Sequence, residues 1–227
     1  MTATSEFAPP TRSKLRELAG LREVPRLALR APWLARLPRG SATVVAFPGF
    51  STNDLFTLPL RAGLRALGHR PFGWGFGVNH AEVEKMLDDV TTMVERRVDE
   101  TGQSAALIGW SNGGVFAREV ARDRPDLVSQ VFTYGTPIFG GPKYTRGAGL
   151  WTNEEIERIE RVVAERNLIP ISRPITAFHS KNDAIVDWRA CIDDFSPDVE
   201  NIEVRSSHAS MGIDPDIWEA IARRLVP

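Results

Sequence analysis

The stretch GWSNGG, at 109–114, places one serine among three glycines. Gly109 and Gly113 lie two residues before and two residues after Ser111. A serine hydroxyl becomes a nucleophile when a neighbouring base takes its proton, and glycines at this spacing leave room for the sharp turn that exposes such a serine. Glycine, serine and asparagine are also common in surface loops, so the flanking sequence has to decide between the two interpretations.

The flanking segments favour a nucleophile. Residues 105–109 form a short apolar run typical of a buried strand, and residues 113–123 have the pattern of a helix. Ser111 is therefore expected on a strand-to-helix turn, in a strained conformation that holds its hydroxyl above the edge of a sheet. In this context a simple surface loop is the weaker interpretation.

A nucleophilic serine needs a histidine as its base and a carboxylate to orient that histidine. When the serine lies on such a turn of an α/β sheet, the acid and then the histidine follow along the chain, each after a later strand. His208 is the only histidine that follows the last expected strand, at 201–205. Asp183 comes soonest after the strand expected at 175–179, so we assign it as the acid. Its rivals further along the chain are Asp187, Asp193 and Asp194.

Acyl transfer also needs N–H donors for the negative charge that develops on the carbonyl oxygen. The backbone N–H of Asn112, next after the serine, is one candidate. The second is expected in the loop after the first strand, at 42–47, where Gly49 lets the backbone approach closely and Phe50 supplies the N–H. Pro48 is excluded because proline has no backbone N–H.

These residues require a sheet that brings several strand ends to one edge. Apolar segments typical of strands alternate with helical segments, which predicts an α/β fold with a mostly parallel sheet and helices on both faces. The expected strands are 42–47, 70–74, 105–109, 130–134, 175–179 and 201–205, and the expected helices are 59–67, 79–101, 113–123, 152–166 and one that begins at 214.

Residues 1–40 differ from the rest and are expected to form a basic, helical N-terminal extension to one domain at 41–227. Between 11 and 40, eight basic side chains accompany two acidic ones, and leucines recur at helical spacing. This pattern fits peripheral contact with an anionic membrane surface or packing of the apolar face on the domain. Three prolines interrupt the helix, so packing is favoured, with the arginines solvated.

Five stretches resemble the strand ends and motif loops of the α/β-hydrolase superfamily, in the right order and over roughly 42–227: VVAFPGF, LIGWSNGG, FTYGTP, HSKNDAIV and SSHASMG. The resemblance is to small lipases and esterases. It implies that Ser111, Asp183 and His208 form a catalytic triad, and that an acyl-enzyme intermediate forms during hydrolysis of carboxylic esters. It implies no cofactor and no metal.

By the same resemblance, Phe50 and Asn112 would supply the oxyanion N–H groups. A thioesterase, or an acyltransferase to an acceptor other than water, would have the same triad. A binding module that kept the fold without catalysis is not favoured, because no triad residue or oxyanion glycine is missing.

Aromatic side chains near the expected site suggest an apolar acyl pocket. Each of them could equally pack in the core. Residues 136–172 lie between two expected strands, where they could form a small cap over the site or an ordinary packed helix. The pocket candidates are Trp110, Phe139, Trp151 and His80, together with Phe50, Trp74 and Phe76.

Composition narrows the partners and the compartment. The 227 residues include 28 basic and 29 acidic side chains, which gives no general attraction to nucleic acid; the expected partner is a small acyl ester. Cys191 is the only cysteine, so no disulfide framework and no cysteine metal site is expected. Without an apolar leader or a membrane-spanning run, the expected location is the cytoplasm.

Overall fold

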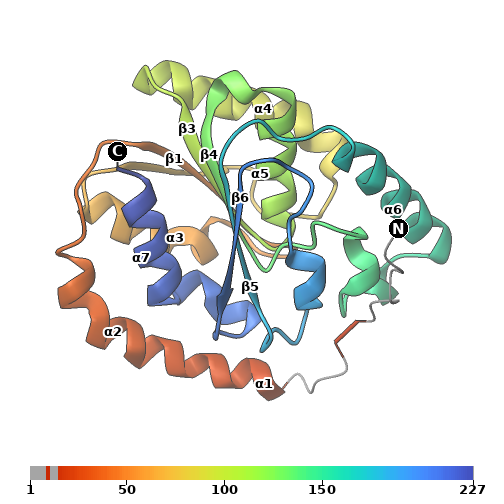
Figure 1. The fold of residues 1–227 in the computed structure, drawn as a ribbon, viewed down its shortest axis with the longest axis horizontal. Coiled ribbons are helices and arrows are strands. Elements are labelled where there is room, and N and C mark those ends of the chain that lie inside the picture. The colour runs from red at the N-terminus through yellow and green to blue at the C-terminus, as the bar shows by residue number, and fades with distance from the viewer. Residues whose placement is uncertain (1–8, 11–14, 227) are drawn as a thin grey trace.

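The computed structural model describes residues 9–10 and 15–226 (Figure 1). At its centre is a six-stranded sheet in the order β2-β1-β3-β4-β5-β6, and every neighbouring pair of strands is parallel. The predicted α/β fold with a largely parallel sheet is therefore confirmed. The strands are β1 (Thr43–Phe47), β2 (Arg70–Gly73), β3 (Ala105–Trp110), β4 (Val128–Tyr134), β5 (Ile175–Ser180) and β6 (Val199–Val204).

Helices cover both faces of the sheet (Figure 1). The helices α4 (Val83–Thr101) and α5 (Asn112–Asp123) pack on one face, and α3 (Asp54–Ala66) and α7 (Pro215–Arg224) pack on the other. Each face has its own apolar cluster, and every residue of β1 and β3 is buried between them. Burial on both sides explains why these strands are continuous apolar runs rather than alternating ones.

Two helices begin at residues that differ from the prediction. Helix α3 starts at Asp54, five residues before Pro59, because the side chain of Asn53 accepts a hydrogen bond from the Leu55 N–H and caps the helix there. Helix α4 starts at Val83 and has no side-chain cap.

The start of α6 agrees with the prediction. The hydroxyl of Thr152 accepts from the N–H of Glu155, whose carboxylate accepts from the N–H of Thr152, and α6 (Asn153–Asn167) follows. Short 3₁₀ helices connect the larger elements: η1 (Ala19–Arg22), η2 (Pro125–Leu127), η3 (Gly141–Tyr144), η4 (Ala148–Leu150), η5 (Trp188–Cys191) and η6 (His208–Ile213).

The N-terminal segment contains α1 (Leu15–Leu18), η1 and α2 (Glu23–Leu34), and α2 runs alongside α7 (Figure 1). The helix continues through Pro25, which stands in its first turn where no N–H is needed, and through Pro32. Its interruption at these prolines was wrongly predicted. Leu34 is buried in an apolar cluster together with Leu37, Leu67 and Ala222.

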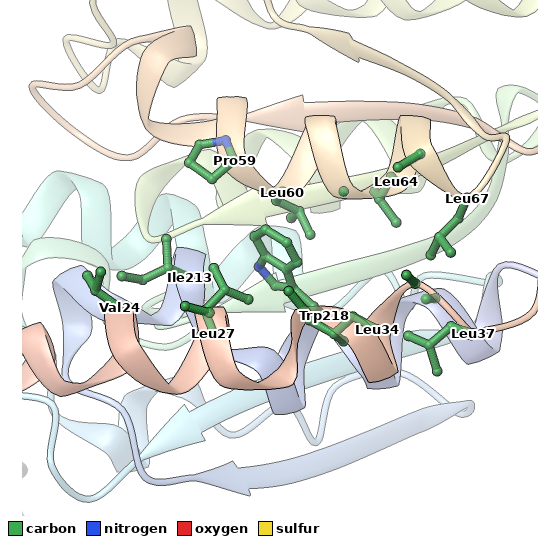
Figure 2. A pocket seen from close by; sticks show the side chains of 16 residues that line it. Val24, Leu27, Leu34, Leu37, Pro59, Leu60, Leu64, Leu67, Ile213 and Trp218 are labelled. Carbon is green, nitrogen blue, oxygen red and sulfur yellow. The ribbon is translucent and has the colours of Figure 1, made fainter.

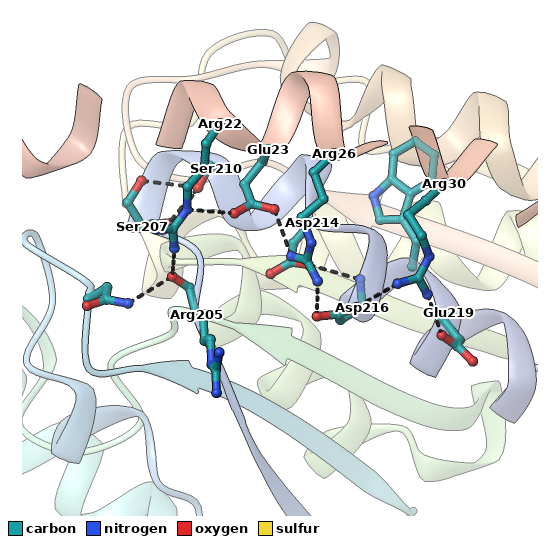
Figure 3. Close-up of polar contacts among 12 residues, drawn as sticks. Arg22, Glu23, Arg26, Arg30, Arg205, Ser207, Ser210, Asp214, Asp216 and Glu219 are labelled. Carbon is teal, nitrogen blue, oxygen red and sulfur yellow. Dashed lines mark hydrogen bonds and ion pairs between the residues drawn. The ribbon is translucent and has the colours of Figure 1, made fainter. Parts of the chain in front are cut away.

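The arginines of α2 are not simply solvated, contrary to expectation. Arg26 forms ion pairs with Glu23, Asp214 and Asp216, and Arg30 pairs with Glu219 (Figure 3). Three of these four carboxylates belong to α7 or to its N-cap, so the basic face of α2 is matched to an acidic one.

We call these ion pairs of Arg26 and Arg30 the polar seam between α2 and α7. Beside the polar seam, α2 leaves a gap against the rest of the domain. An apolar cavity of about 590 Å³ lies between α2, α3 and α7, with Leu27, Leu60 and Trp218 among its walls (Figure 2). No helix among the described residues has the length and apolar character needed to cross a membrane.

Candidate active site

Ser111 lies at the sharp turn between β3 and α5. Its backbone has φ 52° and ψ −125°, a strained conformation for a residue with a side chain. The turn is held by the Ser111 N–H, which donates to the Tyr134 carbonyl on the neighbouring strand over 2.9 Å. A Cβ on Gly113 would overlap the Phe47 carbonyl at the end of β1, and one on Gly109 would overlap the backbone of the turn itself. The glycines flanking the serine are therefore required by close approach.

Asp183 and His208 meet at the same edge of the sheet. His208 Nδ1 lies 2.7 Å from Asp183 Oδ2, and both side chains are buried. The other carboxylate oxygen of Asp183 accepts from the N–H groups of Ile185 and Val186, each over 2.8 Å. The acid is thus fixed by its own loop, with one oxygen left for the imidazole.

The surroundings of His208 make it a stronger base. Burial alone would lower the pKa of the imidazole, but the charge and hydrogen bond of Asp183, together with the charge of Glu17, raise it above its ordinary value of 6.5. Because Nδ1 is engaged by Asp183, Nε2 is the nitrogen left to face a nucleophile.

Ser111 and His208 line one cavity, but no hydrogen bond joins their side chains among the described residues. Contacts of this kind are often long in ligand-free enzymes and close in the substrate complex.

The rival carboxylates are used elsewhere. Asp187 caps η5, accepting from the Arg189 N–H over 2.9 Å, and pairs with the Arg189 guanidinium. Asp193 is buried against Arg118, and Asp194 is exposed.

The loop after β1 packs directly against the serine. A Cβ on Gly49 would lie 3.3 Å from the Ser111 Cβ. Within the described part of the chain, the backbone N–H groups of Phe50 and Asn112 have no hydrogen-bond partner. Ser51, next along, has a positive φ of 58°. Two free donors on strained turns beside one serine fit an oxyanion site.

Asn79 was missed as a residue of this site. Its side chain donates to the Pro48 carbonyl over 2.8 Å, while its own carbonyl accepts from the Ser51 N–H over 2.7 Å. It is fully buried. The sequence pattern suggested a helix cap at Asn79, but the helix begins later and Asn79 instead holds the loop that carries Phe50. The sequence feature that could have pointed to this role is the position of Asn79 at the end of a glycine-rich loop.

The cavity above Ser111 has a volume of about 760 Å³. Its far wall is the apolar face of α6, where Ile159, Val162 and Val163 point inward. Helix α6 thus forms one side of the cavity. At the rim, Arg158 of α6 and Glu84 of α4 form an ion pair of 2.6 Å.

Four of the seven pocket candidates line this cavity: Trp110, Trp151, Phe50 and the exposed His80. The indole N–H of Trp110 also donates to the His208 carbonyl over 3.2 Å, which ties the turn that carries Ser111 to the loop that carries His208. The rings of Phe50 and Trp151 are in contact in a tilted arrangement, with their centroids 5.6 Å apart.

Phe139 was wrongly placed in the pocket. Its ring stacks on Tyr144, 5.4 Å between centroids, in a separate apolar cluster with Val186 and Ala190. The backbone explains this, because the Phe139 N–H donates to the Ala190 carbonyl and ties the residue to η5. Trp74 is likewise a core residue, buried against Phe116.

No protein-family model and no curated protein sequence matches this chain. Solved structures do resemble it. Est1E from Butyrivibrio proteoclasticus, bound to ferulic acid, superposes with a TM-score of 0.67 at 13% identity, covering 82% of this chain and 88% of that one. Mouse alpha/beta hydrolase domain-containing protein 10 superposes with a TM-score of 0.56 at 18% identity, covering 84% and 91%. This chain has the α/β-hydrolase fold.

A structure from the metagenome-derived lipolytic enzymes LipS and LipT also has the α/β-hydrolase fold, with a TM-score of 0.62 at 16% identity over 83% of this chain and 93% of that one. The α/β-hydrolase resemblance of the five sequence stretches is thus confirmed at the level of the fold. In this fold the carboxyl ends of the parallel strands form the ligand edge. Ser111, Asp183 and His208 follow β3, β5 and β6 at that edge.

Proposed function

We propose that the protein is a serine hydrolase that cleaves carboxylic esters with an apolar acyl group. The observation that carries the proposal is the 2.7 Å contact between His208 Nδ1 and Asp183 Oδ2, at the sheet edge where the strained Ser111 lines the same cavity. A buried acid, an oriented imidazole and a hydroxyl that reaches the cavity are the three parts of a nucleophilic triad.

In the proposed reaction, Ser111 Oγ attacks the acyl carbonyl carbon while His208 Nε2 takes the hydroxyl proton. Asp183 holds the imidazole in the required tautomer and stabilises the imidazolium. The carbonyl oxygen gains negative charge and is held by the N–H groups of Phe50 and Asn112. His208 then gives the proton to the alcohol oxygen as the ester C–O bond breaks. The alcohol departs and the acyl group stays on Ser111 Oγ as an acyl-enzyme.

Deacylation repeats these steps with water. His208 takes a proton from the water, the hydroxide attacks the acyl carbon, and Ser111 Oγ leaves with the proton from His208. The apolar face of α6 supports an apolar acyl group as the part of the substrate that fills the cavity.

The test is labelling with a fluorophosphonate, followed by assay of esters of different acyl length and of matching thioesters. Ser111→Ala should fold normally, because the part-exposed hydroxyl contributes little packing, and should lower kcat by about 10⁴–10⁶ if the triad acts as a unit. Mass spectrometry should locate the adduct on Ser111. An adduct on another serine, with Ser111 unmodified, would refute the assignment, and faster turnover of thioesters would make the protein a thioesterase.

A further inference from the structure

Glu17, on α1, contacts both of the loops that carry the proposed acid and base. One carboxylate oxygen accepts from the Ala184 N–H, next to Asp183, over 3.1 Å, and more distantly from the His208 N–H over 3.4 Å. The other oxygen accepts from the Ala209 N–H over 2.9 Å. Glu17 thus joins the two loops that carry Asp183 and His208, which are 25 residues apart in the sequence.

The surrounding segment is fitted to this position. Gly20 is buried, and a Cβ there would lie 2.8 Å from the Ser210 Cβ and overlap the Ser207 hydroxyl, so only glycine lets the segment approach the histidine loop. Two residues later, Arg22 donates to the Arg205 carbonyl over 2.6 Å (Figure 3). Asn182, beside the acid, donates to the same carbonyl over 2.9 Å.

The placement has an electrostatic consequence at the imidazole. Among the described residues, two carboxylates act on His208: Asp183 from the loop after β5 and Glu17 from α1. Both raise the pKa of His208, against the effect of burial. The buried Cys191 thiol contacts the Asp187 carbonyl and lies close enough to Asp183 and Asp187 for both charges to act on it.

We propose that Glu17 is a positioning residue that holds the Asp183 loop and the His208 loop together, so that the acid and the base stay aligned for proton transfer from Ser111. The proposal rests on the serine hydrolase function proposed above. An ordinary packing contact would need only apolar surface here, whereas Glu17 directs both carboxylate oxygens to backbone N–H groups of these two loops.

Three variants test it. Glu17→Gln keeps the shape and one acceptor but removes the charge, and Glu17→Ala removes every contact. Glu219→Gln is the matched control, because Glu219 also docks the N-terminal segment, through Arg30, but on α7 away from both loops. The readouts are the His208 titration followed by NMR of the imidazole C–H signals, the pH profile of kcat/KM with a neutral ester, and the thermal midpoint.

Glu17→Gln should lower the pKa of His208 and move the acid limb of kcat/KM to lower pH by the same amount, because a nearby negative charge has gone. Glu17→Ala should lower kcat/KM by about ten- to a hundredfold, through misalignment of the base. Glu219→Gln should leave the titration and the rate unchanged.

An unchanged His208 pKa in Glu17→Gln would overturn the proposal whatever the rate, because neither the charge of Glu17 nor its hold on the Asp183–His208 contact would then act on the imidazole. So would a kcat/KM of Glu17→Ala within twofold of the wild type, or an equal loss in Glu219→Gln. If Glu17→Ala does not fold, the isosteric Gln variant decides. If the wild type takes no fluorophosphonate label, the hydrolase proposal fails by itself, and the NMR titration still shows whether Glu17 acts on His208.

Discussion

Asp183 and Asp187 lie four residues apart in one loop but have different tasks. Asp183 binds the imidazole of His208, and Asp187 caps η5. Asp183→Asn should lower kcat by about 10⁴, because the amide favours the wrong tautomer of His208. Asp187→Asn should change it by less than about tenfold, because asparagine is an equally good cap. Steady-state kinetics on both folded variants checks this. If Asp187→Asn loses activity while Asp183→Asn remains active, Asp187 is the acid instead.

The pH dependence of activity follows from the environment of His208. The protonated imidazole cannot take the Ser111 proton, so kcat/KM should fall as the pH falls through the pKa of His208. Because that pKa is raised above 6.5, the midpoint of the acid limb should lie above pH 6.5. A profile of kcat/KM with a neutral ester checks this. Activity that persists unchanged to pH 5 would contradict His208 as the base.

The proximity of Ser111, Asp183 and His208 could be predicted from sequence, because each follows a strand end and parallel strands bring those ends together. The positions of Phe139 and Asn79 could not. Both lie on loops whose direction depends on hydrogen bonds to distant segments, to η5 for one and to the loop after β1 for the other. The sequence near Phe139 and Asn79 does not indicate which distant segments they bond to.

At the scale of elements, α6 decides the size of the cavity above Ser111. Val162→Trp should fill part of the cavity and lower the ratio of kcat/KM for an octanoyl ester to that for an acetyl ester by about tenfold or more. Arg161→Trp is the control, since Arg161 is exposed and does not line the cavity. A ratio that is unchanged in Val162→Trp would show that the acyl group lies elsewhere.

Element boundaries were predictable where a side-chain cap is local. Thr152 and Glu155 form the predicted capping box, and α6 starts where they place it. The start of α3 was predicted five residues too late, because Pro59 is typical of a first helical turn. In the structure the Asn53 cap starts the helix earlier, and the packing of Leu60 and Leu64 on the sheet keeps it helical through the proline. Tertiary packing therefore outweighed local preference.

At the scale of the whole molecule, Arg26 joins the N-terminal segment to α7. It contacts Glu23 and Asp214, which are almost fully buried. Removing it leaves Asp214 without its cation, while Glu23 keeps its ion pair with Arg22 (Figure 3). Arg26→Ala should lower the free energy of unfolding by about 1–3 kcal/mol, less than a fully buried pair would lose because Arg26 is itself partly exposed.

Urea unfolding measures this effect, with Arg124→Ala as the control because its ion pairs are exposed. Equal midpoints for the two variants would show that the polar seam between α2 and α7 adds no stability. Membrane contact through 11–40 remains the less favoured alternative for this segment, since Arg26 and Arg30 are paired within the protein.

The contact between α2 and α7 also dictates an order of events during synthesis. Arg26 and Asp216 are separated by 190 residues, so at about 5–20 residues per second the ribosome needs roughly ten to forty seconds to add the partner of a helix it has already made. Through that interval Leu34 and Leu37 have no Ala222 to pack against. Helix α2 is thus translated early but is among the last elements to dock, and until then its apolar face is exposed to aggregation.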